Sequence, residues 1–380
     1  MMVKRVGVIG GGQLAWMMAD AAQRLGVELV IQTPFPDDPA VSIAHEVVFA
    51  PIDNAIATAQ LAQGCDIITF ENEFINLVDL QQLEQQGVCF RPSLAALSPL
   101  LDKYQQRSYL QKINLPVPDF TVLDDSLSVR WPFPVVVKAR RHGYDGQGTF
   151  IIKTPQELEK TRQAFSSITL MVEEFIPFER ELAVMAARSV TGEVVVYPVT
   201  ETYQKNQVCH WAIAPANITP EIQAQVTEIA SHLLTQLQVV GIFGIELFLT
   251  SEGQLLVNEI APRTHNSGHY TLDACNISQF EMQLRAVMGL PLCTPELICQ
   301  GAVMINLLGY EHSNNDYREK RQKMSSLPQT YVHWYGKKES RQGRKLGHVT
   351  VLLEEVIESE IKRQEALLNR AKQIESIWYS

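Results

Sequence analysis

Apolar and polar residues follow two different periods along this chain, and the two periods together predict an α/β protein. The opening segment shows this most clearly. A short apolar run at 6–9 is followed by a Gly-rich turn, by apolar residues at helical spacing over 14–25, and by a second apolar run at 27–31. Gly26 is expected to end the helix, because glycine readily adopts the left-handed conformation found after many helix C-termini.

The same patterns predict elements along the rest of the chain. Strands are expected at 66–70, 133–138, 150–153, 170–176, 181–188, 194–198, 245–250 and 254–260. Helices are expected from Ser98 to about 110, over 222–237, from Ser278 to 287, and from about 353 to the C-terminus. Ser98 is expected to cap its helix, and Ser278 opens a capping box with Glu281.

The strands at 245–250 and 254–260 are expected to form a hairpin around the turn Ser251-Glu252-Gly253. If the turn is centred on Glu252-Gly253, Glu246 lies opposite Glu259, with Cβ atoms roughly 4.5–5.5 Å apart. Such a pair of like charges destabilises a sheet unless a cation offsets it, and Mg²⁺ prefers carboxylate oxygens. Two other interpretations stay open: a Lys or Arg from elsewhere neutralises the pair, or the register slips by one residue and the two never meet.

Polar side chains crowd the segment after this hairpin. Arg263, His265, Asn266 and His269 stand in a short loop bounded by Pro262 and a glycine, directly after a strand end. Loops at strand ends carry binding and catalytic residues more often than the scaffold does. We therefore expect the active site here.

Composition narrows the class of protein without identifying it. The 380 residues suggest two or three domains, and 46% apolar with 19% charged residues is ordinary for a globular protein. A net charge of −10 argues against a general nucleic-acid binder. The six cysteines lack a C-x-x-C spacing, so reduced thiols of a cytoplasmic protein are expected. The chain shows neither an apolar run of membrane-spanning length nor a signal peptide, so no membrane partner is expected.

The Gly-rich turn at 10–15 fits the loose pattern G-x-G-x-x-A of dinucleotide-binding proteins, so an NAD(P)-linked oxidoreductase has to be considered. The fit is weak, because no acidic residue stands at the tip of the second strand to bind a ribose hydroxyl. The turn could hold another anion, or it could be a tight turn without a ligand. Glu71 and Glu73 follow a later strand and could bind ribose hydroxyls or an amine, or be solvated.

Two further segments are suited to phosphate. Lys138 ends an apolar strand and is followed by a Gly-rich turn at 143–149, whose backbone could close over phosphates. The spacing differs from a Walker A motif, and an ordinary hairpin with a basic turn is the alternative. A basic cluster spans 337–345; such a run is usually a solvated turn, but it could equally hold a phosphate monoester.

Taken together, these motifs resemble the N5-carboxyaminoimidazole ribonucleotide synthetases, the ATP-dependent carboxylases of purine biosynthesis within the ATP-grasp superfamily. The resemblance covers nearly the whole chain and is carried by segments 10–15, 69–73, 138 with 143–148, 172–176, 258–263, 265–269 and 344–348. The sequences His-Asn-Ser-Gly-His and Arg-Lys-x-Gly-His are the most specific of them. The chain departs from the family pattern at Trp16, where arginine is frequent, and at Gln204, where some members have histidine.

The resemblance implies a Rossmann-like N-terminal domain (1–97), an ATP-grasp lid subdomain (98–170), a large subdomain (171–300) and a C-terminal region (301–380) that packs on the large subdomain. It implies a ligase that uses ATP, Mg²⁺ and bicarbonate, without biotin, to carboxylate 5-aminoimidazole ribonucleotide through carboxyphosphate. A homodimer is expected. Alternatives are another ATP-grasp ligase acting on a purine-pathway ribonucleotide, an NAD(P)-linked oxidoreductase, or a non-catalytic nucleotide-binding regulatory subunit.

The resemblance also implies roles for individual residues. Those implied to bind ATP are Lys103, Lys138, Gly143, Tyr144, Asp145, Gly146, Gln147, Gly148, Thr149, Glu173, Glu174, Phe175, Ile176, Glu181, Gln204, Asn258 and Glu259. Those implied to bind the ribonucleotide are Gln13, Glu73, Arg263, His265, Asn266, Ser267, Lys337, Lys338, Arg344 and Lys345. Catalytic roles are implied for Tyr144, Asp145, Arg263, His265 and Lys337, and Mg²⁺ ligation for Glu246 and Glu259. The glycines of 143–148 are expected to form a lid that becomes ordered when a nucleotide binds.

Overall fold

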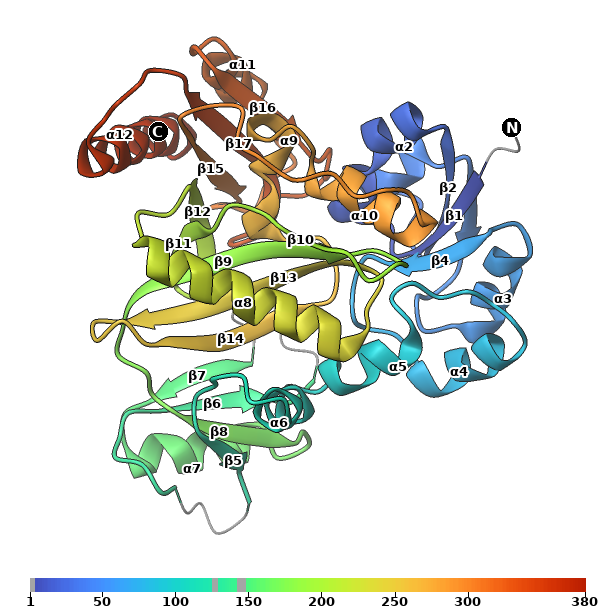
Figure 1. Ribbon diagram of the computed structural model, residues 1–380, viewed down its shortest axis with the longest axis horizontal. Helices are drawn as coiled ribbons and strands as arrows, with labels where there is room; N and C mark the ends of the chain where they lie inside the picture. Colours follow the sequence, from blue (N-terminus) through green and yellow to red (C-terminus); the bar gives the residue numbers. More distant parts are fainter. Residues whose placement is uncertain (1–3, 125–128, 142–147) are drawn as a thin grey trace.

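The computed structural model describes residues 4–124, 129–141 and 148–380, and it contains three β-sheets with helices packed around them (Figure 1). The first sheet is parallel, with strand order β3-β2-β1-β4. Its strands are β1 (Lys4–Ile9), β2 (Val27–Thr33), β3 (Glu46–Phe49) and β4 (Ile67–Phe70). Its helices are α1 (Gln13–Trp16), α2 (Ala19–Leu25), α3 (Ala55–Gln63), α4 (Leu77–Gln85) and α5 (Leu94–Leu97).

The opening strand–helix–strand unit is confirmed, with one difference. The single helix expected over 14–25 is divided into α1 and α2, because the amide of Met18 bonds three residues back, to the carbonyl of Ala15, and tightens the turn between them. Gly26 ends α2 with φ of 64°, as expected.

A second, four-stranded sheet lies at the lower end of the molecule in Figure 1, with order β5-β8-β6-β7. Its strands are β5 (Phe120–Val122), β6 (Val135–Ala139), β7 (Thr149–Ile152) and β8 (Leu170–Glu174), with helix α7 (Pro155–Ala164) packed against them. β8 pairs with both β5 and β6, so residues 170–174 share a sheet with the segment before them. The boundary that we expected at residue 170, between the lid subdomain and the large subdomain, therefore falls inside this sheet.

Helix α6 (Lys103–Lys112) begins later than expected, and Ser98 does not cap it. Ser98 instead starts a short 3₁₀ helix (Ser98–Leu100). The cap is Asp102, whose carboxylate accepts hydrogen bonds from the amides of Tyr104 (2.9 Å) and Gln105 (3.1 Å). This start places Lys103 in the first turn of the helix.

The third sheet is the largest, with nine strands among the described residues and the order β14-β13-β9-β11-β12-β15-β17-β16. β10 pairs separately with β9. The strands are β9 (Phe178–Arg188), β10 (Val194–Val196), β11 (Thr200–Lys205), β12 (Val208–Ala214), β13 (Gly241–Thr250), β14 (Leu255–Ala261), β15 (Gly301–Leu308), β16 (Thr330–Trp334) and β17 (Lys345–Leu353). The C-terminal strands thus extend the central sheet itself.

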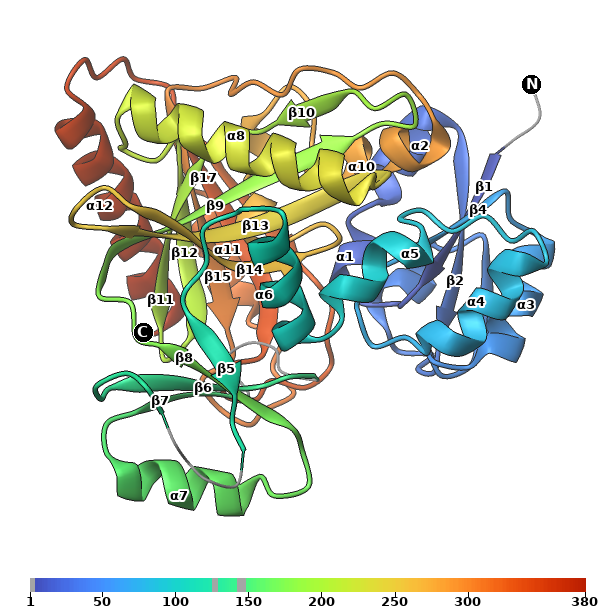
Figure 2. The same cartoon turned by 60° about the horizontal axis from the view of Figure 1, so that its bottom comes forward.

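Helices cover both ends of this sheet. α8 (Pro220–Leu237) packs its apolar face on β9, β13 and β14, and α12 (Glu360–Trp378) packs on β15 and β17 (Figure 2). The remaining helices are α9 (Thr271–Ala274), α10 (Gln279–Met288) and α11 (Arg318–Ser325). Ser278 caps α10 as expected, since its side chain accepts a hydrogen bond from the amide of Glu281. Within the three described ranges, no helix combines the length and the apolarity needed to cross a membrane.

Candidate active site

The hairpin of β13 and β14 brings the two predicted carboxylates together. Glu246 and Glu259 are direct partners in the ladder, which confirms the predicted pairing. The register near the turn was wrong, however: there Leu249 pairs with Leu255 and Leu247 with Val257, one residue short of the expected partners. Asn258 is an extra residue in β14, a β-bulge that restores the expected register beyond it.

The bulge also directs two consecutive side chains of β14 toward charged partners. The amide oxygen of Asn258 accepts a hydrogen bond from Lys138 Nζ (3.2 Å), and Glu259 Oε1 lies 3.0 Å from Lys103 Nζ. In a regular strand, neighbouring side chains point to opposite faces, so only one of the two could reach this side. Lys103 comes from α6 and Lys138 from β6, so three elements converge here.

The two carboxylates differ in their proton affinity. Burial and then the neighbouring Glu259 raise the pKa of Glu246 to about 8. Partial burial has the same direction at Glu259, but the charge and hydrogen bond of Lys103 outweigh it and lower the pKa of Glu259 to about 2. The proton affinity of Glu246 is therefore higher than that of Glu259. Two carboxylates and an amide oxygen, placed side by side, fit a hard divalent cation, which would offset the repulsion between the carboxylates.

A buried ion network stands behind Lys138. Its ammonium group lies 2.7 Å from Glu173 Oε2. The Glu173 carboxylate also accepts hydrogen bonds from Nε (2.6 Å) and Nη2 (3.3 Å) of Arg107. Arg107 and Glu173 are each only 2% exposed. Sequence reasoning assigned Glu173 to the nucleotide and missed Arg107. The missed signal was that Lys103, Arg107 and Leu110 share one face of a helix, so polar residues occupy positions where apolar ones are expected.

The loop after β14 is held in place by Gln279, a residue that the sequence analysis did not predict to take part in the site. Gln279 accepts a hydrogen bond from the amide of His265 (2.9 Å) and donates one to its carbonyl (2.8 Å). His265 Nδ1 contacts Ser267 Oγ (2.9 Å), and Nε2 lies 3.6 Å from Glu246 Oε1. Gly244 is required for this approach, because a Cβ atom there would fall 2.5 Å from that of His265.

Other predicted substrate residues of this loop have partners within the protein. Arg263 Nε lies 3.0 Å from Glu73 Oε1, which joins the large sheet to the end of β4. Asn266 exchanges two hydrogen bonds with Asn306, at 2.9 and 2.7 Å. The Asn266 side chain therefore supports the loop from inside, whereas Arg263 pairs with Glu73 and His265 faces Glu246.

The Gly-rich turn at 10–15 binds an anion that belongs to the chain itself. The Glu71 carboxylate accepts hydrogen bonds from the amides of Gly12 (2.6 Å), Leu14 (3.0 Å) and Ala15 (3.5 Å). A Cβ atom at residue 12 would collide with this carboxylate. Glu71 fills the place where a dinucleotide pyrophosphate would bind, so the oxidoreductase alternative is wrong. Gln13 stands at the start of α1, next to this contact.

Replacing Glu71 with Ala is expected to lower the free energy of unfolding by roughly 3 kcal/mol, because three amides, two of them buried, would lose their acceptor. The control is Asp53→Ala, which changes an exposed acid in the same domain. Urea unfolding of both variants measures the difference. A Glu71→Ala protein as stable as the control would show that water replaces the carboxylate without cost.

The basic loop between β16 and β17 reaches the same region from the C-terminal side. Lys337 Nζ donates a hydrogen bond to the carbonyl of Lys345 (2.9 Å), and Arg344 Nη1 donates one to the carbonyl of Glu339 (2.9 Å). Lys338 contacts Asp37 of the first domain (2.5 Å). The charge of Lys345 is close enough to Glu246 to favour its ionised form. The loop and the carboxylate pair therefore belong to one electrostatic site.

The predicted nucleotide residues lie on the strands that surround this centre. Glu174 accepts a hydrogen bond from the amide of Asp119 (2.8 Å), Phe175 and Ile176 follow β8, and Gln204 lies on β11. Burial raises the pKa of Glu181, on β9, to about 7. Five of the predicted residues lie outside the described residues: Gly143, Tyr144, Asp145, Gly146 and Gln147.

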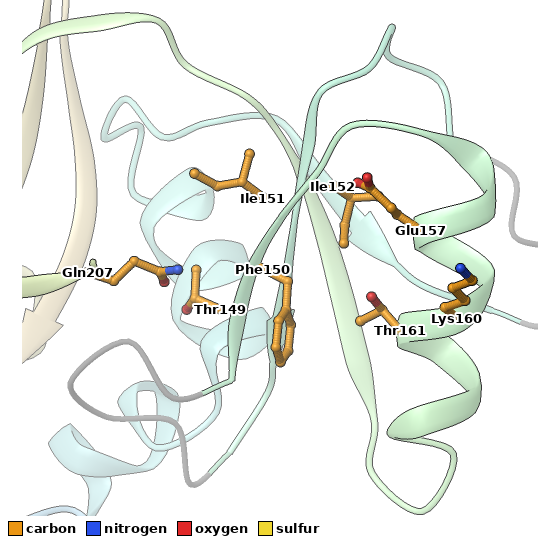
Figure 3. Close-up of a pocket in the computed structure, with 8 residues that line it drawn as sticks. All are labelled: Thr149, Phe150, Ile151, Ile152, Glu157, Lys160, Thr161 and Gln207. Atoms are coloured by element: carbon orange, nitrogen blue, oxygen red, sulfur yellow. The ribbon is translucent and has the colours of Figure 1, made fainter. Parts of the chain in front are cut away.

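A hollow of about 390 Å³ lies beside the edge strand β7, but it is not this centre (Figure 3). Thr149 and Ile151 point to one side of the strand, whereas Phe150 and Ile152 point toward α7. Thr149 is the only predicted site residue among those that line the hollow. The converging charges, rather than this hollow, identify the site.

Comparisons with known proteins agree with this geometry. Family models match three successive segments: the ribonucleotide synthetase pre-ATP-grasp domain at 2–99, the ATP-grasp domain at 108–280, and the phosphoribosylaminoimidazole carboxylase C-terminal domain at 302–362. The N5-carboxyaminoimidazole ribonucleotide synthase of Synechocystis sp. is 53% identical over 98% of both chains.

Solved structures show the same relationship. The ADP complex of an N5-carboxyaminoimidazole ribonucleotide synthetase superposes with a TM-score of 0.90 at 33% identity, over 99% of this chain and 97% of the other. The synthase of Aspergillus clavatus, in complex with ADP and 5-aminoimidazole ribonucleotide, gives a TM-score of 0.89 at 28% identity over 98% of both chains. Family models match three successive segments of the chain, and relatives match over nearly its whole length. The chain therefore belongs to the N5-carboxyaminoimidazole ribonucleotide synthase family of ATP-grasp proteins.

Proposed function

We propose that this protein is a ligase that carboxylates 5-aminoimidazole ribonucleotide with bicarbonate, at the expense of ATP, and releases N5-carboxyaminoimidazole ribonucleotide, ADP and phosphate. One observation carries the proposal: Lys103, Lys138 and the Glu246/Glu259 pair adjoin a second group of cations in the loop 337–345. Two separate groups of cations suit two phosphorylated ligands. The names of two similar proteins, both N5-carboxyaminoimidazole ribonucleotide synthases, support the same reaction.

The first group of cations is suited to the triphosphate. Lys103 and Lys138 would neutralise phosphate oxygens, which matters because phosphoryl transfer depends on positioning and charge stabilisation. Glu246 and Glu259 would hold Mg²⁺, with Asn258 beside them, and the ion would supply further neutralisation of the phosphates. Lys138 is 7% exposed, so its charge acts in a setting where little water competes.

The second group would hold the ribonucleotide. Lys337, Arg344 and Lys345 can bind its phosphate, with Lys338 at the outer rim, while Arg263 and His265 stand between the two groups. Bicarbonate oxygen attacks the γ-phosphorus and ADP leaves; the 5-amino nitrogen then takes the carboxyl carbon from carboxyphosphate, and inorganic phosphate leaves. The amine must lose a proton in this second step, and His265, with Nδ1 held by Ser267, can accept it.

The decisive experiment measures ADP release by the purified protein while bicarbonate and the aminoimidazole ribonucleotide are omitted in turn. We expect release to require both, and N5-carboxyaminoimidazole ribonucleotide to form without biotin. Product formation without bicarbonate would indicate another ATP-grasp ligase, and absence of steady turnover would indicate a regulatory subunit. The lid over 143–148 and the homodimer stay predictions from the family resemblance, and the cytoplasmic location stays a prediction from the cysteine content.

Nucleotide binding is expected to depend on pH through Glu181. Because the pKa of this carboxyl is raised to about 7, it is largely protonated at pH 6 and ionised at pH 8. The ionised form accepts hydrogen bonds from ribose hydroxyls better, so ADP affinity should fall severalfold as the pH drops from 8 to 6. Calorimetric titrations with ADP at fixed Mg²⁺ concentration would measure this change in affinity. In Glu181→Gln the affinity should be lower and lose this part of the pH dependence; equal pH profiles would refute the assignment.

A further inference from the structure

The strand that carries Asn258 and Glu259 lies at the very edge of the large sheet, so one side of its backbone has no neighbouring strand. Edge strands expose unpaired amide and carbonyl groups there. Around the bulge in β14 these groups belong to Val257 and Ile260, three residues apart, because the extra residue Asn258 shifts the alternation by one. All four of their backbone groups nevertheless have partners.

Gln106 supplies two of these partners. Its side-chain oxygen accepts a hydrogen bond from the amide of Ile260 (3.1 Å), and its side-chain nitrogen donates one to the carbonyl of Ile260 (3.2 Å). One amide side chain thus replaces a residue of a neighbouring strand. Gln106 is 4% exposed, so water does not compete for these bonds.

Arg107 supplies a third partner and connects it to the lysines of the site. Its Nη1 donates a hydrogen bond to the carbonyl of Val257 (3.1 Å), and the same guanidinium binds Glu173, the partner of Lys138. The fourth partner is the carbonyl of Pro116, which accepts from the amide of Val257 (2.8 Å). Figure 2 shows α6 between the small sheet and β14.

We infer that Gln106 and Arg107 are positioning residues for the proposed Mg²⁺–phosphate site. They hold β14 on both sides of Asn258-Glu259 and fix these two side chains against Lys138 and Lys103. Lys103 lies one helical turn before them in α6, so a single helix carries both the cation that contacts Glu259 and the groups that hold its strand. The inference rests on the proposed function for the identity of the ligands, but the geometry can be tested without the reaction.

The test compares Gln106→Leu with Gln105→Leu, a change of the adjacent exposed glutamine in the same helix. Leu keeps the approximate volume of Gln but removes both hydrogen bonds to Ile260. We expect Mg²⁺-dependent ADP binding, measured by calorimetry, to weaken about 10- to 100-fold in Gln106→Leu, which is the usual effect of losing a group that orients a metal ligand. Gln105→Leu should bind like the wild type.

A second readout reports the geometry directly. Hydrogen exchange at the Ile260 amide should become faster in Gln106→Leu, while amides of β13 and β9 keep their protection. The KM for the aminoimidazole ribonucleotide should hardly change, since the loop 337–345 is untouched. For Arg107, the charge-conserving Arg107→Lys should retain more Mg²⁺-dependent ADP binding than Arg107→Met.

Unchanged Mg²⁺-dependent ADP binding in a folded Gln106→Leu protein, or equal weakening in Gln105→Leu, would overturn the inference. If Gln106→Leu does not fold, Gln106→Glu takes its place: it keeps an acceptor for the Ile260 amide but loses the donor to its carbonyl, and it should still weaken binding. If the wild type fails to carboxylate the ribonucleotide while these binding changes appear, the proposed reaction is wrong and the positioning role stands.

Discussion

Replacing Glu259 with Gln is expected to lower kcat/KM by about 100-fold or more, which corresponds to roughly 3 kcal/mol in the barrier. The substitution keeps the shape of the side chain but removes the charge that faces Lys103 at 3.0 Å and that would bind the cation. Glu246→Gln should have a smaller effect, because the neighbour of Glu246 is His265, at 3.6 Å, whereas Glu259 faces the charged Lys103.

The matched control is Glu252→Gln, which changes an exposed carboxylate in the turn of the same hairpin. It should retain wild-type activity, and circular dichroism should show that all three variants fold. Initial rates over a range of Mg²⁺ concentrations separate loss of the cation from loss of the fold. Near-normal turnover of Glu259→Gln at low Mg²⁺ would contradict the assignment of this pair.

Arg344→Ala or Lys345→Ala is expected to raise the KM for the aminoimidazole ribonucleotide about 10- to 100-fold, since a hydrogen bond to a charged group contributes roughly 1.5–3 kcal/mol. The KM for ATP should hardly change in Arg344→Ala. The arginine contacts Glu339 within its own loop, and within the part of the chain that the structure describes it makes no contact with Lys103 or Lys138.

Arg341→Ala is the control for this loop, because it removes an exposed cation from the same turn. Steady-state kinetics with each substrate varied in turn give the comparison. If Arg344→Ala weakens ATP binding and leaves the ribonucleotide KM unchanged, the loop does not bind the ribonucleotide and its assignment is wrong.

Local patterns predicted ten of the strands and one pair of residues across a hairpin, but they did not predict β11, β12, β15, β16 or β17 of the large sheet. The strands of the hairpin have strong apolar runs, and the turn residues have a restricted conformational preference, so Glu246 and Glu259 could be paired without a structure. The pairing was nevertheless obtained with the wrong register at the turn. A bulge depends on which side chains the rest of the molecule offers to β14, and the pattern of that strand alone does not contain this information.

Residues whose roles come from distant partners could not be found in this way. Glu71 follows a strand end that favours ligand binding, yet its partner is the chain's own turn, which lies 59 residues away at Gly12. Gln279 was placed in a helix by its spacing, and its bonds to His265 depend on how that helix packs under the loop. Polar residues of this kind carry little local signal, because their helices would form equally well with other side chains.

The central sheet contains β15, β16 and β17 as well as β9 to β14, and this affects the chain while it is being synthesised. β12 has β15 as its neighbour, and β15 in turn needs β17 and the final helix to cover it. Until β15 and the elements that cover it leave the ribosome, β12 therefore presents an open, apolar edge that can pair with other chains. A protein truncated before β15 would keep every residue of the Glu246/Glu259 hairpin and still be prone to aggregate.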